Sequence, residues 1–337
     1  MKKQIIAAAV AAAFAVPAAA QVTISGRVDQ SLGNGTSTAD KKANRVNSSL
    51  LTTSQLVITG SEDLGGGLKA NLYVSSQLAP DTGTFSWGNR GFTVGLSGKF
   101  GAVTIGKDAG SAIDAIATSA VVNNLGNYSV LNNRVNNSIS YTSPSFSGMT
   151  ARVIYTAGND DGTDDTAKKQ NRLTEVSATY VGGPLTVRLA QSKTSMAAIA
   201  TAATATNSFG TTASTAASTR DDVSERGIQA NYNAGFALIN ARYVERTTEG
   251  AETGTGLRDQ NATGYGASIP VAGVALNLDY LKLDHSTATS SFAITSATVV
   301  KELSKRTNVY GAYSAKDYDD TAKNTESIYA IGVRHSF

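Results

Sequence analysis

The C-terminal stretch Tyr329-Ala330-Ile331-Gly332-Val333-Arg334-His335-Ser336-Phe337 carries a large or ring-bearing side chain at every second position. Successive side chains of a strand point to opposite faces, so one face holds Tyr329, Ile331, Val333, His335 and Phe337. Alanine, glycine, arginine and serine occupy the other face. This alternation predicts a strand with one side against hydrocarbon and the other against water, as in a transmembrane β-barrel. We expect the first face, ending at Phe337, to serve as the signal recognised during barrel assembly.

The N-terminus has the features of an export signal. Two lysines, Lys2 and Lys3, precede an apolar stretch at 5–16 and the small residues Ala18-Ala19-Ala20. A basic start, a short apolar run and a small-residue cleavage site are typical of a secretory signal peptide. We therefore expect residues 1–20 to be removed and residues 21–337 to form a single outer-membrane barrel domain. No later segment approaches the roughly 18 uninterrupted apolar residues that a membrane-spanning helix needs.

Composition narrows the classes of protein that this chain can represent. Without Lys2 and Lys3, 27 of the 29 basic residues remain against 26 acidic ones, so the exported chain is nearly neutral and gives no sign of a nucleic-acid partner. Cysteine is absent, which excludes disulfide bonds and thiolate metal sites. With 32 glycines, 13 tyrosines and only 16% charged residues, the chain is typical of neither a disordered tail nor a helical bundle. These features favour an all-β fold.

After residue 21 the chain repeats one unit, a run of alternating apolar and polar residues followed by a turn. About sixteen runs can be counted, near 22–33, 47–60, 67–78, 88–99, 101–108, 135–144, 147–158, 170–182, 184–194, 221–233, 235–247, 258–270, 272–284, 290–303, 306–316 and 325–337. Their connections alternate between short turns and long loops, and the segment 79–87 is expected to be a long loop. An even number of strands joined in this way predicts a transmembrane antiparallel up-and-down β-barrel.

Two polar motifs are weighed against catalysis and metal binding. The acidic run Asn159-Asp160-Asp161-Gly162-Thr163-Asp164-Asp165 fails as an EF-hand because Ala157 and Lys168 occupy the first and last ligand positions. It is interpreted as a solvated loop, with weak divalent-cation binding as the alternative. The two histidines, His285 and His335, give little support to a catalytic constellation of serine, histidine and acid. We therefore expect no catalytic residue, no cofactor and no metal site.

Two long connections have unusual compositions. The stretch 195–219 is almost entirely alanine, threonine and serine, which predicts an outer loop without a core of its own, a receptor or phage contact being the alternative. The stretch 109–133 instead contains apolar residues that an exposed loop does not need. We predict that they pack against the inner wall of the barrel, and the alternative is an exposed loop with chance apolar content. These residues are Ile113, Ile116, Val121, Val122 and Leu125.

Several stretches together resemble the general diffusion porins of Gram-negative outer membranes, across nearly all of the chain after residue 20. They are Gly60-Ser61-Glu62-Asp63-Leu64-Gly65-Gly66-Gly67-Leu68, Val94-Gly95-Leu96-Ser97-Gly98-Lys99-Phe100-Gly101, Asn137-Ser138-Ile139-Ser140-Tyr141-Thr142-Ser143-Pro144-Ser145-Phe146-Ser147-Gly148, Leu303-Ser304-Lys305-Arg306-Thr307 and Gly332-Val333-Arg334-His335-Ser336-Phe337. The resemblance implies a trimeric barrel of 16 strands whose third loop folds into the lumen and narrows the pore.

The resemblance also implies a constriction in which basic residues on the wall face acidic groups on the third loop. Arg90 and Arg134 match two wall positions, Lys107 occupies a third where the family usually has arginine, and Asp114 is the matching acid on the loop. Arg90 shares strand parity with Phe92, so alternation alone does not turn it inward.

On the second strand this chain departs from the family pattern in Ser54-Gln55-Leu56-Val57-Ile58-Thr59-Gly60, where Gln55 and Thr59 replace two expected cations. The resemblance therefore implies a weaker field across the pore than in relatives. Further candidates for the lining of the lumen are Asp29, Gln55, Thr59 and Lys69.

These observations predict a passive channel for small hydrophilic solutes and ions across the outer membrane of a Gram-negative bacterium. Because basic residues outnumber Asp114 at the expected constriction, we expect a weak preference for anions. The expected partners are two further copies of the chain, outer-membrane lipid and lipopolysaccharide, and the barrel-assembly machinery. The alternative function is that of an adhesin or structural surface protein with a barrel anchor.

Overall fold

A computed structural model describes residues 21–34, 44–108, 110–126, 134–156, 172–195, 222–249, 259–286, 291–320 and 325–337. The export signal expected at 1–20, the acidic run at 159–165 and residues 196–219 of the alanine- and threonine-rich loop lie outside these ranges. Neither helical segment in the described part of the chain is long and apolar enough to span a membrane.

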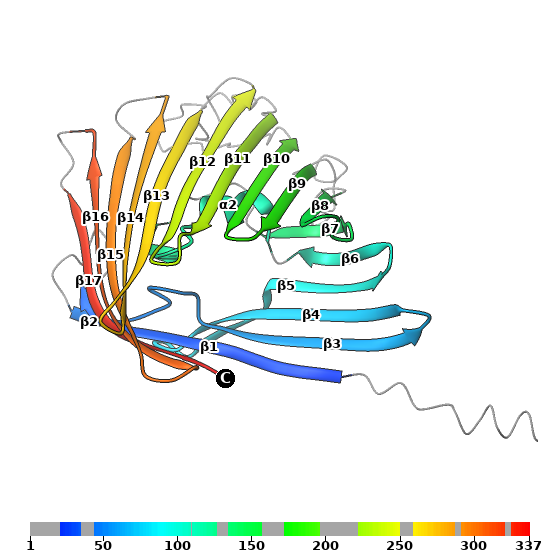
Figure 1. The fold of residues 1–337 in the computed structure, drawn as a ribbon, viewed down its shortest axis with the longest axis horizontal. Helices are drawn as coiled ribbons and strands as arrows, with labels where there is room; N and C mark the ends of the chain where they lie inside the picture. Colours follow the sequence, from blue (N-terminus) through cyan, green and yellow to red (C-terminus); the bar gives the residue numbers. More distant parts are fainter. Residues whose placement is uncertain are drawn as a thin grey trace, which may run out of the picture.

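The described strands form one antiparallel sheet that closes into a barrel, because β1 pairs with β17 (Figure 1). The strands are β1 Gln21–Asn34, β2 Asn44–Ser48, β3 Gln55–Gly65, β4 Leu68–Ala79, β5 Thr84–Gly98, β6 Gly101–Asp108, β7 Val135–Thr142, β8 Met149–Thr156, β9 Arg172–Gly182, β10 Leu185–Ser195, β11 Asp222–Asn233, β12 Leu238–Glu249, β13 Gln260–Val271, β14 Val274–His285, β15 Phe292–Glu302, β16 Thr307–Tyr318 and β17 Glu326–Ser336. Closure pairs the backbone groups around the ring, which lipid cannot satisfy.

The barrel has sixteen strand positions, as the sequence predicts, although it contains seventeen strand segments. β2 and β3 both pair with the same edge of β1, β2 along its second half and β3 along its first. They are therefore two parts of one predicted strand, 47–60, which is interrupted at residues 49–54. A second difference lies at the segment 79–87, expected to be a long loop, because β5 already begins at Thr84 and leaves only a tight turn at residues 80–83.

The two faces of the barrel wall differ as period-two alternation requires. Apolar side chains such as Ile24, Val94 and Ile331 are exposed on the outside, whereas alternate positions carry polar residues that point into the lumen. Exposed aromatic residues collect towards both ends of the strands, with Phe100 beside a short turn and Trp87 near the opposite rim. Such aromatic girdles mark the two interfaces of a membrane-embedded barrel.

The final residue takes part in closing the barrel. The amide of Phe337 donates to the carbonyl of Gly26 at 3.0 Å, and the amide of Gly26 donates back to Phe337 at 3.0 Å. A Cβ atom at position 26 would lie 2.5 Å from Cζ of Phe337, so glycine leaves room for the aromatic ring. The terminal residue is thus hydrogen-bonded to the first strand as well as following the last one.

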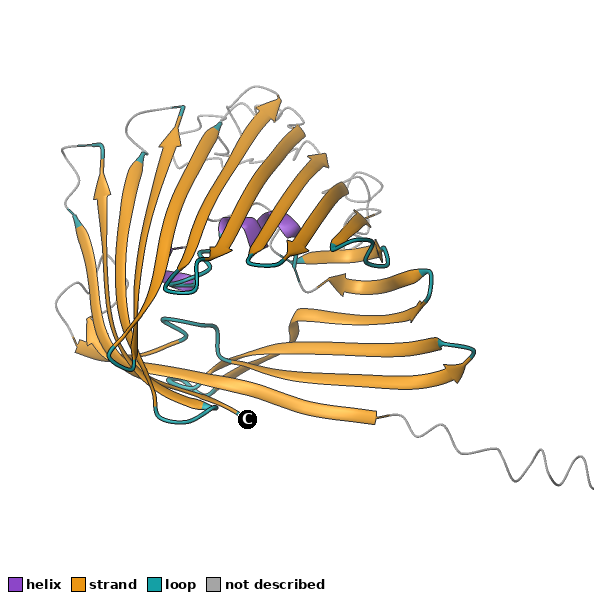
Figure 2. Ribbon diagram, in the orientation of Figure 1, coloured by secondary structure: helices purple, strands orange, loops and turns teal. Residues whose placement is uncertain are grey.

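The third loop is the connection between β6 and β7, of which residues 110–126 are described. It folds into the lumen, which confirms the prediction made from its apolar residues. It contains the helix α2 Ala112–Ala117 and the 3-10 turn η1 Asn124–Gly126, drawn in purple inside the ring of strands in Figure 2. Two apolar clusters hold it against the wall. One joins Ile113, Ile116 and Ala117 to Ala190, Val244, Ala262, Leu281 and Leu283, and the other joins Val121, Val122 and Leu125 to Leu50, Leu51, Tyr310, Ala312 and Ala330.

Candidate functional site

Buried polar side chains of the wall fix both ends of α2. Oε1 of Glu175, on β9, accepts a hydrogen bond from the amide of Ala112 at 2.6 Å. At the other end, Nε2 of Gln229, on β11, donates to the carbonyl oxygens of Ile116 at 3.3 Å and Thr118 at 3.1 Å. Because a short helix leaves many backbone groups without partners, these contacts determine where α2 lies in the lumen.

The loop is held further along by a buried ion pair. Oγ of Ser119 donates to Oδ1 of Asp279 at 2.7 Å, and Nη2 of Arg242 lies 2.7 Å from Oδ2 of the same carboxylate. Both charged side chains are almost fully buried. A Cβ atom at Gly264 would lie 2.5 Å from Cζ of Arg242, and one at Gly266 would lie 2.7 Å from Oδ1 of Asp279. Glycine at these wall positions gives the ion pair and the loop room to approach the sheet.

On the other side of the lumen the structure brings Arg90, Arg134 and Asp114 together. Nη1 of Arg134 lies 3.3 Å from Oδ2 of Asp114, and Nε of Arg90 donates to Oε1 of Gln55 at 3.1 Å. The charges of Arg134 and Asp114 both act on the guanidinium of Arg90. Three of the four residues that the resemblance implies for the constriction are therefore neighbours.

A bulge explains why Arg90 faces the lumen. The register of β4 with β5 shifts next to Ser76, so residues 87–90 form an irregular segment on β5. Period-two alternation does not continue through such a bulge. Arg90 consequently reaches Gln55 inside the barrel, although Phe92 is exposed on the outer surface.

Two arginines that sequence reasoning missed extend this group. Arg27 on β1 pairs in register with Gln55, and Arg334 on β17 lies opposite Asp29 in register, beside Arg27. The charge of Arg334 acts on Arg27, and that of Arg27 acts on Arg90. The cation absent at position 55 is thus supplied from the neighbouring strand. Arg27, Arg90, Arg134 and Arg334 are called the arginine band below. In the sequence, Arg27 and Arg334 both fall on the polar face of an alternating strand, and this position could have identified them as lumen residues.

The acidic side chains on the lumen side are mostly engaged by wall arginines. Asp108 forms an ion pair with Arg152, and Glu225 lies 2.7 Å from Arg246. Asp114, whose side chain is 27% exposed, faces the arginine band, and the buried Asp29 lies beside Arg27. Burial raises the pKa of the Asp114 carboxyl above its ordinary value, and the charge of Arg134 opposes that rise.

Lys107 lies on β6, and its place at the constriction stays a prediction. It pairs with Phe92, whose side chain is exposed on the outer surface, and it alternates with Asp108, which forms its ion pair inside the barrel. The register of β6 with β7 shifts between Gly106 and Asp108, so alternation alone does not fix the direction of the Lys107 side chain.

The remaining lumen candidates take different places. Thr59 lies four residues along β3 from Gln55, roughly 13 Å at the rise of a strand, and Lys69 lies beside the β3–β4 turn opposite Asp63. Both positions have lumen-facing parity but are away from the arginine band. Asp29 has the same parity, yet its side chain is fully buried beneath residues 49–54.

A closed antiparallel barrel with an apolar outer face, a polar lumen and a loop folded inward defines a pore of the outer-membrane type. A family model described as "Gram-negative porin" matches residues 7–321, so the chain belongs to that family. It is 30% identical to "Outer membrane porin protein 32" of Delftia acidovorans over the full length of both chains, and 32% identical to "Major outer membrane protein P.IB" of Neisseria gonorrhoeae over 49% of this chain and 51% of that protein.

Solved structures agree with this assignment. The barrel matches a structure described as "Anion-selective porin from Comamonas acidovorans" with a TM-score of 0.73 and 25% identity, covering 95% of this chain and 100% of the other. A loop-deletion form of OmpT of Vibrio cholerae matches with a TM-score of 0.71 at 18% identity, covering 95% and 100%, and shows the shared fold alone. The protein is therefore a passive diffusion channel of the Gram-negative outer membrane.

Proposed function

We propose that the channel prefers small hydrophilic anions over cations and that the arginine band causes this preference. The supporting observation is an imbalance of charge along one wall. Among the described residues, four arginines line the wall, whereas two acids lie beside them, Asp114, which binds Arg134, and the buried Asp29. A ring of charged side chains biases the ions that enter a pore. The similar porin of Comamonas acidovorans is described as anion-selective, which supports the same conclusion.

The preference is expected to be modest. The lumen is filled with water, in which two unit charges 4 Å apart interact by only about 1 kcal/mol. Salt at physiological ionic strength shortens the reach of exposed charges to about 8 Å. The band therefore shifts the ratio of anions to cations without blocking cations altogether.

Reversal potentials in a potassium chloride gradient across a planar bilayer test the proposal. Arg27→Gln and Arg90→Gln should each move the reversal potential of the open channel towards cations. Arg226→Gln is the matched control, because it removes the same charge from a side chain that is 70% exposed on the outer face. A cation-selective wild-type channel, or an equal shift in the control variant, would contradict the proposed role of the band.

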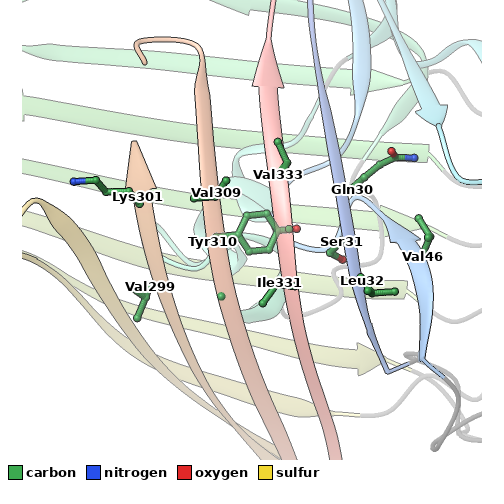
Figure 3. A pocket seen from close by; sticks show the side chains of 12 residues that line it. Gln30, Ser31, Leu32, Val46, Val299, Lys301, Val309, Tyr310, Ile331 and Val333 are labelled. Carbon is green, nitrogen blue, oxygen red and sulfur yellow. The ribbon is translucent and has the colours of Figure 1, made fainter. Parts of the chain in front are cut away.

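The proposal includes a homotrimer formed through the outer face near the barrel closure. A groove of about 680 Å³ lies on this face and is lined by residues of β1, β2, β15, β16 and β17. Figure 3 shows the side chains that line it. Its apolar lining is Leu32, Val46, Val299, Val309, Ile331 and Val333. Exposed apolar surface of this kind can pack against lipid or against another copy, and the resemblance to trimeric porins favours a second copy.

Native electrophoresis in mild detergent distinguishes trimer from monomer. The wild-type protein should migrate near three times the mass of the exported chain. Val299→Arg should release monomers, whereas Leu189→Arg, at a similarly exposed outward position on β10, should not. Purely monomeric wild-type protein under several gentle conditions would contradict the trimer.

Outward basic residues suggest where lipopolysaccharide binds. Lys193, Arg226 and Lys282 lie on the outer face towards the long-loop ends of β10, β11 and β14, away from the groove. We propose that they contact anionic groups of lipopolysaccharide, and that the face ending at Phe337 is recognised by the barrel-assembly machinery. Replacing the three basic residues by glutamine should lower the amount of lipopolysaccharide that co-purifies with the barrel. We further propose that passage of solute involves no chemical step, cofactor or metal.

A further inference from the structure

A second segment enters the lumen from the side of the barrel closure. Residues 49–54, called the inward turn below, connect β2 to β3 and leave the wall, as the loop between these strands in Figure 2 shows. Leu51 of this turn is buried against Val121, Val122 and Leu125 of the third loop. The third loop is therefore packed between the wall formed by β10–β14 and the inward turn, which lies on the side of β1.

Asp29 holds the inward turn in place. Its Oδ2 accepts hydrogen bonds from the backbone amides of Leu51 at 3.1 Å and Thr52 at 2.6 Å. Its own carbonyl accepts from the amide of Ser49 at 2.8 Å, and its amide donates to Oγ of Ser54 at 2.9 Å. A carboxylate that accepts several backbone N–H groups is a strong local anchor, because hydrogen bonds to a charged group are stronger than those between neutral groups.

Tyr310 completes the anchor from the other side of the closure. Its hydroxyl donates to Oδ1 of Asp29 at 2.5 Å. To reach it, the ring crosses β17 at Gly332, which pairs with Tyr310 on one side and with Ser31 on the other, and Figure 3 shows the ring lying across that strand. A Cβ atom at position 332 would lie 2.3 Å from Cζ of Tyr310. Asp29 and Tyr310 are called the clamp, because their hydrogen bond joins β1 to β16 across β17.

The inward turn contacts both sides of the proposed constriction. Nδ2 of Asn124, in the third loop, donates to the carbonyl of Ser49 at 2.9 Å, and the amide of Asn124 donates to the carbonyl of Leu51 at 3.2 Å. On the other side, the carbonyl of Thr53 accepts from Nε of Arg27 at 3.1 Å. One short segment thus positions an arginine of the band and the distal half of the third loop.

We infer that Asp29 and Tyr310 are positioning residues for ion selection, and that the inward turn is a second element of the constriction. Neither residue of the clamp meets a permeating ion, since both are buried. Loss of Asp29 leaves buried amides of the turn without their acceptor, and loss of the Tyr310 hydroxyl removes the hydrogen bond that holds this acceptor in place. Either change destabilises the inward conformation of the turn. Arg27 then loses the fixed carbonyl that orients it, and the third loop loses two hydrogen bonds.

Tyr310→Phe is the primary test, because it removes only the hydroxyl and keeps the ring. The folded channel should show a reversal potential closer to zero in a potassium chloride gradient and larger open-channel current noise than wild type. Tyr313→Phe is the matched control, since Tyr313 lies three residues along β16 with its side chain 48% exposed on the outer face. An unchanged reversal potential and unchanged noise in Tyr310→Phe would overturn the inference.

A chemical probe follows the inward turn independently of ion selection. The chain contains no cysteine, so Thr53→Cys introduces a single thiol into the turn. A water-soluble methanethiosulfonate reagent should label this thiol faster when Tyr310→Phe is also present. The direction of the reversal shift rests on the proposed anion preference, whereas noise and labelling rate do not. Equal labelling rates in the two backgrounds would overturn the positioning role even if the channel prefers anions.

Gly332→Ala perturbs the same clamp without changing either of its residues. The added methyl group displaces the ring of Tyr310, so the variant should reproduce the noise and reversal shift of Tyr310→Phe. In a Tyr310→Ala background the same substitution should add nothing, because no ring remains to displace. A folded Gly332→Ala trimer with wild-type selectivity and noise would contradict the inference.

Discussion

The charges at the proposed constriction form a series that can be altered one unit at a time. The four arginines of the band and the carboxylate of Asp114 give a net charge of +3, and the buried carboxylate of Asp29 beside Arg27 adds the same −1 to every variant. Arg134→Ser lowers this value to +2, Asp114→Asn raises it to +4, and the double variant returns it to +3. Because Arg134 and Asp114 are ion-paired at 3.3 Å, the double variant also removes the pair as a unit. We expect anion preference to follow net charge in this order.

The size of each step follows from the distance between a wall charge and an ion on the pore axis. At roughly 10 Å in a water-filled lumen, one unit charge contributes about 0.4 kcal/mol. Screening reduces this to about 0.3 kcal/mol at 0.01 M salt and about 0.15 kcal/mol at 0.1 M. A lost positive charge disfavours anions and favours cations equally, so the permeability ratio should change about 2.7-fold at 0.01 M and about 1.7-fold at 0.1 M.

Reversal potentials of single channels at both salt concentrations measure these ratios. The folded fraction of each variant is checked by heat-modifiable migration on gels, since all the altered side chains face water. An unchanged reversal potential in Arg134→Ser at 0.01 M would remove Arg134 from the constriction. A double variant that resembles either single variant, rather than wild type, would refute the additivity of charge on which the reasoning depends.

Three further outcomes are expected. Acidification should strengthen anion preference, because protonation removes the negative charge of Asp114. Since burial raises the pKa of this carboxyl, the change should begin at a higher pH than for an exposed aspartate. Reversal potentials measured as a function of pH should show this change in the wild type and lack it in Asp114→Asn. Deleting Phe337 or replacing it with aspartate should reduce the yield of folded, heat-modifiable barrel without altering the conductance of channels that do form, and a normal yield would contradict its role in closure. Ile116→Ala should cost the packing of the third loop about 2–5 kcal/mol and increase current noise, whereas Ile105→Ala on the outer face should not.

Much of the architecture could be predicted from the sequence because alternation in a strand is a local property. The terminal residues up to Phe337 show both faces of a membrane strand within nine positions, and the same period recurs along the chain. The inward course of the third loop was predictable for a similar reason. Ile113, Ile116 and Val122 are larger and more apolar than a solvated loop requires, and burial against the wall removes them from water.

The candidate site depended on tertiary structure, because its residues are distant in sequence and their directions are set by irregularities. Arg27 and Arg334 become neighbours only when β1 pairs with β17, and neither residue carries a local signal of that contact. The bulge at residues 87–90 turns Arg90 inward, where uninterrupted alternation would place it on the outer face with Phe92.

The inward turn at residues 49–54 belongs to the same category. The sequence predicts one continuous strand at 47–60, and the chain leaves the wall there because Asp29, Tyr310 and the third loop supply its backbone and apolar side chains with partners. Those partners lie more than twenty residues away in sequence, and for Tyr310 on the opposite side of the closure. Strand periodicity therefore determined the barrel, while closure of the ring decided which charges and anchors meet inside it.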